Sequence, residues 1–204
     1  MTKIVDFEKK EKDVDFEYER RFLNDFIRSM KILKEDFGIK LELVGLLTNR
    51  LSEALNCNSD ALYFAGYYAN IGLMMIDKII SRPEFISSDQ ERKIIKEHVH
   101  YSSHFLESRG LITSAFIVEN HHEKPNGKGY FSQPNKDKNA AIVNIADEFV
   151  GISSNKSYKP YTIKKIAIRE TLKEYDHSTI FTRDEIEMIK SVLDNFYNTI
   201  RSVQ

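Results

Sequence analysis

The densest group of side chains able to do chemistry is His121, His122 and Glu123. Imidazole is a common ligand for Zn, Fe, Mn or Ni. The group is followed by a loop, Lys124-Pro125-Asn126-Gly127-Lys128-Gly129-Tyr130. Its alternating glycines allow the backbone to pass close to a phosphate or to another chain. These residues therefore indicate a metal site with an adjoining loop that contacts a phosphate or a partner.

The string resembles the signature of HD-GYP domains, bacterial phosphodiesterases that open cyclic di-GMP with a cluster of metal ions. The family pattern is His-His-Glu, two or three variable residues that include an Asp, and then Gly-x-Gly-Tyr-Pro. In this chain Asn126 stands in place of the Asp and Phe131 in place of the Pro, while the other fixed positions match. The resemblance extends from about residue 38 to the end. It implies an all-α fold, an HD-domain-like helical bundle, with an extra N-terminal helix.

Composition agrees with such a domain. Glycine (8) and proline (4) are scarce among 204 residues, which favours helices with short connections. The 30 Lys and Arg nearly balance the 31 Asp and Glu, so net charge gives no support for binding a nucleic-acid polymer. Cys57 is the single cysteine, which excludes an intrachain disulfide. No apolar run approaches the roughly 20 residues of a membrane span, so we expect a soluble, cytoplasmic protein.

Apolar periodicity and capping residues divide the chain into helices. Residues 1–37 are predicted to form a charged, poorly ordered tail of about 14 residues and an amphipathic helix, and residues 38–204 the domain. That first helix packs on the domain or serves as a dimerisation or docking arm. The predicted helices span about 16–36, 41–55, 60–80, a segment opened by Ser88 that carries His98, His100 and His104, a segment from Leu111 to His121, 140–152, 162–174, and a last one opened by Thr182.

The resemblance implies metal ligands at seven positions contributed by successive helices. In this chain they are Lys40, Ala69, Asn70, His98, His121, His122 and Asp147. Ala69 and Asn70 replace the His-Asp pair that names the domain, and Leu73 replaces a nearby Lys. Since His98 and His100 cannot share one helix face, at most one of them points into the site, and His98 is the better match to the family. His100, His104 and His177 are given no role in the site.

These substitutions alter the chemistry that the resemblance implies. Asn70 carries no charge and is a poor bridging ligand for two metal ions, so the paired-metal mechanism is expected to be lost. If Lys40 occupies the first His position, its ammonium can fill the empty volume and pair with Asp147. The metal residues are then His98, His121, His122 and Asp147, which hold one divalent transition metal (Fe, Mn, Ni or Zn) or none. Without a metal, the histidines are hydrogen-bonded relics and Asp147 is ion-paired.

The loop residues are candidates for ligand binding or protein interaction. They comprise Lys124, Gly127, Lys128, Gly129 and Tyr130 in the first loop, and Lys156 and Lys159 in a second segment that resembles the family's Ser-x-Arg-Pro-Tyr-Arg turn. A phosphate contact is one interpretation of these lysines, and simple solvated charges are the other. Tyr130 either anchors its loop or belongs to a docking surface.

Two functions follow from these observations. The first is a catalytically degenerate HD-GYP domain that acts in cyclic-dinucleotide signalling by binding cyclic di-GMP or a signalling protein such as a GGDEF domain, with homodimerisation also open. The alternative is a residual metal-dependent phosphodiesterase that uses one ion held by the three histidines. A helical scaffold without a ligand is a third, plainer possibility.

Overall fold

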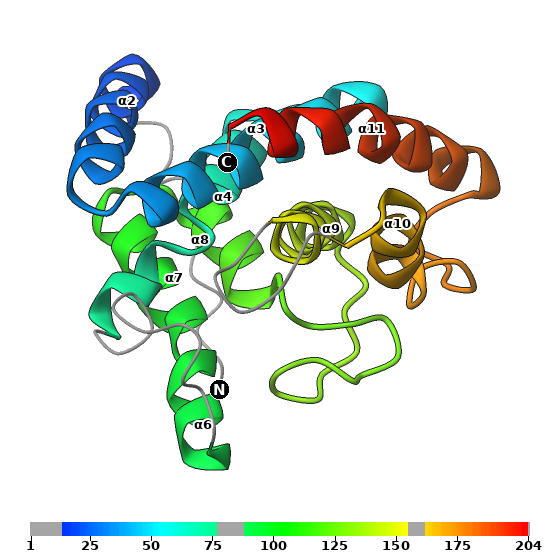
Figure 1. The fold of residues 1–204 in the computed structure, drawn as a ribbon. Coiled ribbons are helices and arrows are strands. Elements are labelled where there is room, and N and C mark those ends of the chain that lie inside the picture. Colours follow the sequence, from blue (N-terminus) through cyan, green and yellow to red (C-terminus); the bar gives the residue numbers. More distant parts are fainter. Residues whose placement is uncertain (1–13, 77–87, 155–161, 204) are drawn as a thin grey trace.

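A computed structural model describes residues 14–76, 88–154 and 162–203, and these residues form helices and turns without a strand (Figure 1). The predicted all-α fold is thereby confirmed. None of the described helices is long and apolar enough to cross a bilayer. Most of the charged tail, the end of the helix predicted over 60–80, and Lys156 and Lys159 lie outside the described residues.

Several helices follow one another directly, whereas a long loop joins α8 to α9. In the first half they are α2 (Phe16–Leu33), α3 (Glu35–Ala54), α4 (Asp60–Tyr68), the 3-10 helix η2 (Ile71–Met75), and α6 (Asp89–Lys96). In the second half they are α7 (His98–Ser108), α8 (Ile112–Asn120), α9 (Lys138–Ser153), α10 (Lys164–Leu172) and α11 (Arg183–Ser202).

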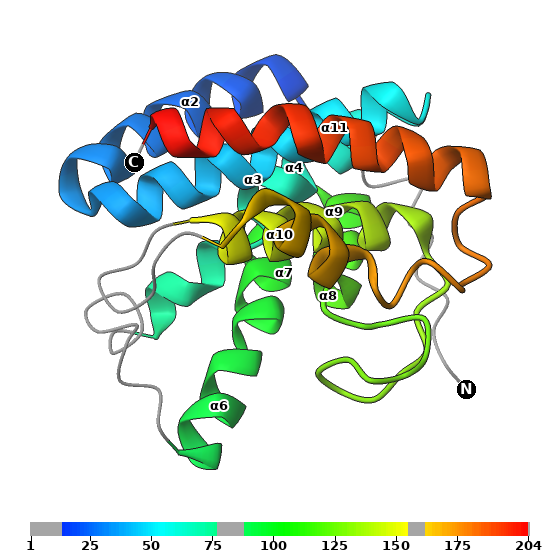
Figure 2. The same cartoon turned by 45° about the vertical axis from the view of Figure 1, so that its right-hand side comes forward.

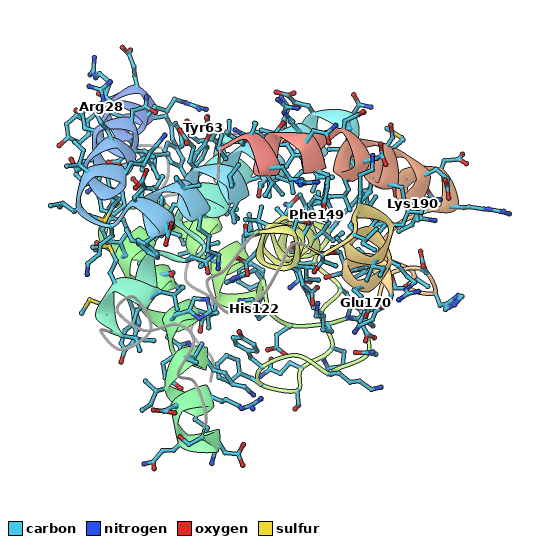
Figure 3. The ribbon with its side chains drawn as sticks, in the orientation of Figure 1. Arg28, Tyr63, His122, Phe149, Glu170 and Lys190 are labelled. Atoms are coloured by element: carbon cyan, nitrogen blue, oxygen red, sulfur yellow. The ribbon has the colours of Figure 1, made fainter. Side chains whose placement is uncertain are left out.

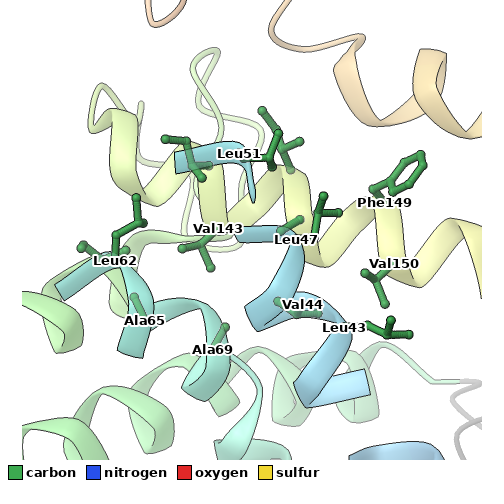
Figure 4. Packing of buried hydrophobic residues seen from close by; sticks show 14 of the residues in the cluster. Leu43, Val44, Leu47, Leu51, Leu62, Ala65, Ala69, Val143, Phe149 and Val150 are labelled. Carbon is green, nitrogen blue, oxygen red and sulfur yellow. The ribbon is translucent and has the colours of Figure 1, made fainter. Parts of the chain in front are cut away.

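The central element is α9, which packs against α3, α4, α8, α10 and α11. Its side chains are buried on nearly every side, as expected for a helix that is apolar all round. Figure 4 shows Val143, Phe149 and Val150 of this helix among apolar side chains of α3 and α4. Helix α11 lies along α3 and returns the end of the chain toward α2, whereas α6 extends away from the bundle (Figure 2).

The N-terminal helix α2 packs on the same core through Leu23, Ile27 and Met30. A buried carboxylate fixes it further: Glu19 accepts hydrogen bonds from Arg109 Nε at 2.6 Å and Nη2 at 3.0 Å. Such a fork-shaped guanidinium contact is geometrically specific. The predicted boundary between residues 37 and 38 remains a prediction.

Two helix starts predicted from capping residues are confirmed: capping boxes open α6 at Ser88 and α11 at Thr182. At the start of α4, Ser59 Oγ accepts from Leu62 N. The boundaries of two predicted helices differ from those in the structure. The first helix ends at Leu33 and α3 begins at Glu35, and the segment opened by Ser88 is divided at Glu97 into α6 and α7.

The predicted continuous helix over 60–80 is wrong within its described part. Helix α4 ends at Tyr68, and a turn leads into η2. The side chain of Ser102 on α7 explains the change: its Oγ donates to Ala69 O at 3.0 Å and accepts from Gly72 N at 2.8 Å. Because this hydroxyl supplies hydrogen bonds that an α-helix would otherwise make, the chain can turn here without leaving backbone groups unpaired.

Gly72 makes the close contact between η2 and α7 possible. A Cβ atom at this position would lie 2.1 Å from the backbone oxygen of His98 and 2.8 Å from Ser102 N. The absence of a side chain therefore sets how near α7, with His98 at its start, approaches the end of α4.

We expect Gly72→Ala to lower the free energy of unfolding by about 2 kcal/mol or more, since the new methyl group meets backbone atoms that must shift. Gly151→Ala in α9 is the matched control, because a Cβ there meets no atom of the described residues within 4 Å. This substitution should be neutral or stabilise the helix by up to about 1 kcal/mol. Urea unfolding of both variants checks the pair, and equal stabilities would contradict the proposed close contact.

Candidate metal centre

Side chains from α9 and from four other parts of the chain lie close together at one site. Lys40 comes from α3, Asn70 from the turn after α4, His98 from the first residue of α7, and Asp147 from α9. His121 and His122 follow the end of α8, and His122 lies inside the fold (Figure 3). The structure thus brings together the predicted metal residues, but it divides them into two adjoining groups.

The first group is the three-histidine cluster, formed by His98, His121 and His122. One nitrogen from each ring lies within 4.8 Å of the corresponding nitrogens of the other two. The ring centroids of His98 and His121 are 5.6 Å apart, and those of His121 and His122 are 4.0 Å apart. Among the described residues this is the group of His, Cys, Asp and Glu that can hold a metal ion.

Backbone contacts orient two of the rings. His98 Nδ1 lies 2.8 Å from Ile95 O, and His121 Nδ1 lies 2.6 Å from Val118 O. A carbonyl oxygen can only accept, so each Nδ1 donates and each neutral ring leaves its Nε2 lone pair free. Both Nε2 atoms are buried and have no hydrogen-bond partner among the described residues. Buried acceptors without a partner, oriented by backbone carbonyls on their other nitrogen, fit the coordination of a divalent metal ion.

The surroundings keep these imidazoles neutral. Burial, reinforced by the neighbouring His121, lowers the pKa of His98 to about 3. Burial also lowers the pKa of His121, and burial together with His121 lowers that of His122 well below its usual value. Neutral imidazole is the form that binds metals, so the ligands need not lose a proton near pH 7.

The second group is a charged network of Lys40, Asn70 and Asp147. Lys40 Nζ lies 3.0 Å from Asp147 Oδ1 and donates to Asn70 Oδ1 at 3.0 Å, while Asn70 Nδ2 donates to Asp147 Oδ1 at 2.7 Å. Burial alone would raise the pKa of the Asp147 carboxyl. The Lys40 ammonium, by its charge and its hydrogen bond, and the neighbouring His122 and His121 together outweigh that effect, and the pKa lies far below its usual value. The ion pair expected between Lys40 and Asp147 is therefore confirmed.

The two groups touch at one point, where His122 Nε2 lies 3.7 Å from Asp147 Oδ2. Asp147 is oriented mainly by Lys40 and Asn70. At the neighbouring position, Ala69 is fully buried within the apolar core (Figure 4), and Leu73 is also buried. These residues contribute packing at the positions where the resemblance implies a metal ligand and a lysine.

Glu123 holds the loop that covers the cluster. Its carboxylate accepts from Phe131 N at 2.8 Å and from Gln133 N at 2.9 Å. The loop passes so closely that a Cβ at Gly129 would lie 2.5 Å from Glu123 Cα. As a result, the Tyr130 ring stacks on His122 with centroids 4.2 Å apart. The structure thus places Tyr130 over the three-histidine cluster.

The loop lysines occupy different environments. Lys124 is largely buried and donates to Asn144 Oδ1 at 2.7 Å and Glu148 Oε2 at 2.6 Å. Lys128 is exposed, and its backbone N donates to Asn126 Oδ1. Gly127 adopts a positive φ of 73° in the turn between them. Of these two lysines, Lys128 is the one positioned to meet a ligand from solvent.

The remaining histidines lie outside the cluster. His100 pairs with Glu119, His104 with Glu107, and His177 is exposed. The structure places His98, and not His100, in the three-histidine cluster.

Ser102 and the bridging role of Asn70 were missed by sequence reasoning. Ser102 stands four residues after His98 and therefore on the same face of α7, which is the signal that would have found it.

Replacing the Lys40 ammonium should be costly because it leaves the Asp147 carboxylate buried without its cation. We expect Lys40→Met to lower the free energy of unfolding by about 3 kcal/mol. Lys31→Met, which breaks a more exposed pair with Glu42, should cost between about 0 and 1 kcal/mol. Denaturant unfolding at pH 7 measures both values. A loss for Lys40→Met no larger than that for Lys31→Met would show that the pair contributes nothing.

The metal-free protein should lose stability as the pH falls below about 6.5, the pKa of an unfolded-state histidine. Between that value and the folded pKa of His98, about 3, the unfolded chain binds a proton that the folded chain does not. Stability therefore rises with pH across this window. Asp147 adds an effect of the same sign below about pH 4, because its folded pKa is depressed.

Urea unfolding from pH 7.5 to 4.5 measures this slope, and His98→Asn should make it shallower by up to about 1.4 kcal/mol per pH unit. His104→Asn, at an exposed position on the same helix, should leave the slope unchanged. A slope that does not respond to His98→Asn would mean that this ring is already charged in the folded protein.

Comparison with known proteins agrees with this geometry. A search of curated proteins found no match. Among solved structures, the HD domain of the phosphodiesterase PgpH from L. monocytogenes is similar to this chain, with a TM-score of 0.64 and 16% identity. The match covers 86% of this chain and 98% of that domain, and at this identity it shows a shared fold. The HD domain family matches residues 19–178, most of the chain. The chain belongs to the HD domain family.

Proposed function

We propose that this HD-family chain is a catalytically degenerate HD-GYP domain that acts in cyclic-dinucleotide signalling by binding a ligand or a protein. The observation that carries the proposal is the Lys40 ammonium bonded to both Asn70 and Asp147. In an active paired-metal domain of this kind, a carboxylate bridges two ions. Here an amide stands at that position and a lysine neutralises the one remaining carboxylate.

The loop supports a binding role. Glu123 fixes the Gly-x-Gly-Tyr loop by two backbone hydrogen bonds, and Lys128 is exposed on it. A preorganised loop loses little conformational entropy on binding, and an exposed ammonium beside it suits a phosphate. Cyclic di-GMP and a signalling protein such as a GGDEF domain are the candidate partners.

A second candidate is a residual phosphodiesterase with a reduced metal site. It is favoured by the buried, unpartnered Nε2 atoms of His98 and His121. A divalent ion held by the three-histidine cluster would supply Lewis-acid activation of a phosphoryl group. Tyr130 and the Glu123-anchored loop would then help to exclude water from the cluster.

The two candidates differ in turnover. The protein, purified without a tag and then loaded with Mn²⁺, Fe²⁺ or Zn²⁺, is incubated with cyclic di-GMP and with bis-p-nitrophenyl phosphate, and products are followed by chromatography and absorbance. We expect binding of cyclic di-GMP by calorimetry without its hydrolysis. Turnover that disappears in His121→Ala would contradict the proposal and support the residual enzyme.

In the same calorimetric assay, Lys128→Ala should weaken cyclic di-GMP binding by about tenfold, the value of one charge-assisted phosphate contact. Lys190→Ala is the control, since Lys190 lies on α11 far from His122 (Figure 3). Equal affinities for the two variants would remove the loop from the ligand site. Absence of any nucleotide binding would leave a protein partner as the remaining form of the proposal, tested by titrating the chain with a purified GGDEF domain.

A further inference from the structure

We propose that Lys40 determines the metal selectivity of this chain. Its ammonium holds Asp147 out of the metal-binding set, so the three-histidine cluster takes a single ion of the nitrogen-preferring kind, represented by Zn²⁺ and Co²⁺. The proposal concerns metal binding in the absence of nucleotide, and it does not depend on the signalling role proposed above.

The donors of the cluster are all imidazole nitrogens. Two of the rings are fixed by their backbone carbonyls, so that Nε2 is the free donor, and the nitrogens offered by the three rings already lie within 4.8 Å of one another. Imidazole suits Zn²⁺, Cu²⁺, Fe²⁺ and Ni²⁺, whereas Mn²⁺ and Mg²⁺ prefer carboxylate, carbonyl and water oxygens. Three neutral imidazoles also match the ligand set of known three-histidine zinc sites.

Among the described residues, Asp147 is the carboxylate close enough to the three-histidine cluster to change its metal preference. Its Oδ2 lies 3.7 Å from His122 Nε2 and adjoins the cluster. Its Oδ1 is shared between Lys40 Nζ at 3.0 Å and Asn70 Nδ2 at 2.7 Å. Because Lys40 and Asn70 both hold Oδ1, they fix the orientation of the carboxylate and neutralise its charge, which weakens Oδ2 as a metal ligand. The network therefore leaves a poor oxygen donor beside the cluster.

The charge of Lys40 acts in the same direction. Lys40 and Asp147 neutralise each other, and the three histidines are neutral, so the site offers no net negative charge that would attract a second divalent ion. One ion bound mainly by covalent nitrogen coordination is the outcome that this arrangement favours.

The first experiment measures stoichiometry and preference. Protein stripped with a chelator is titrated separately with Zn²⁺, Co²⁺ and Mn²⁺, and bound metal is determined by elemental analysis after dialysis. We expect one Zn²⁺ or Co²⁺ per chain, with visible absorption bands for the Co²⁺ form that are lost in His121→Ala and kept in His104→Ala. Two ions per chain, or none, would overturn the proposal.

Divalent metals generally bind N/O sites in the order Mn²⁺ < Zn²⁺, so a preference for zinc alone proves little. The decisive quantity is the ratio of Zn²⁺ to Mn²⁺ affinity and its change on substitution. Lys40→Met should lower this ratio by about tenfold or more, because it frees a carboxylate for Mn²⁺, and outer-shell changes act on metal affinity at this scale. Lys31→Met, which loses an exposed charge on α2, should leave the ratio unchanged.

Two further variants keep the test independent of folding losses. Lys40→Met combined with Asp147→Asn removes both charges and should retain the wild-type ratio and zinc affinity. Asn70→Asp keeps the ammonium but adds a second carboxylate beside it, so the ratio should fall as in Lys40→Met. A loss of zinc affinity beyond about tenfold in the double variant would make Asp147 a metal ligand and refute the proposal. An unchanged ratio of Zn²⁺ to Mn²⁺ affinity in both Lys40→Met and Asn70→Asp would also refute the proposal. Circular dichroism confirms that each variant is folded.

Discussion

The constraint on which the site depends is the burial of one carboxylate. Asp147 lies on the central helix α9, where an unpaired negative charge would cost several kcal/mol. The Lys40 ammonium and the Asn70 amide together satisfy it. Because this neutralisation comes from within the chain, the native state does not need a metal ion to balance its buried charge. Folding is thereby separated from the supply of metal, unlike in sites whose ligands depend on the ion.

A second constraint acts on the loop after α8. Glu123 directly follows the two histidines, and its carboxylate accepts hydrogen bonds from two backbone amides of the loop. Gly129 is required because the backbone passes within contact distance of Glu123. The signature His-His-Glu followed by Gly-x-Gly-Tyr thus has a structural explanation beyond metal binding. It fixes a loop whose tyrosine ring lies on His122.

Much of the fold and part of the site could be predicted from the sequence. Helical periodicity and the capping residues Ser88 and Thr182 placed the starts of α6 and α11, and the family resemblance indicated that Lys40 could pair with Asp147. The turn after Tyr68 was missed because apolar residues continue on both sides of it, although Asn70 and Gly72 within the stretch are poor helix formers. What ends the helix is Ser102, a residue distant in sequence. Likewise, Asn70 read alone is a lost ligand, and its bridging role depends on Lys40 and Asp147, which come from other helices.

The contact between η2 and α7 has a mechanical consequence. Ser102 is bonded to the backbone on both sides of Asn70, at Ala69 O and Gly72 N, while His98 begins the same helix as Ser102. The three-histidine cluster and the charged network therefore share a common support. Any displacement of α7, for example by a partner that binds the projecting helix α6, would be transmitted to both groups at once. The three-histidine cluster and the charged network are thus expected to move together with α7, and Gly72 is the residue at which η2 contacts that helix.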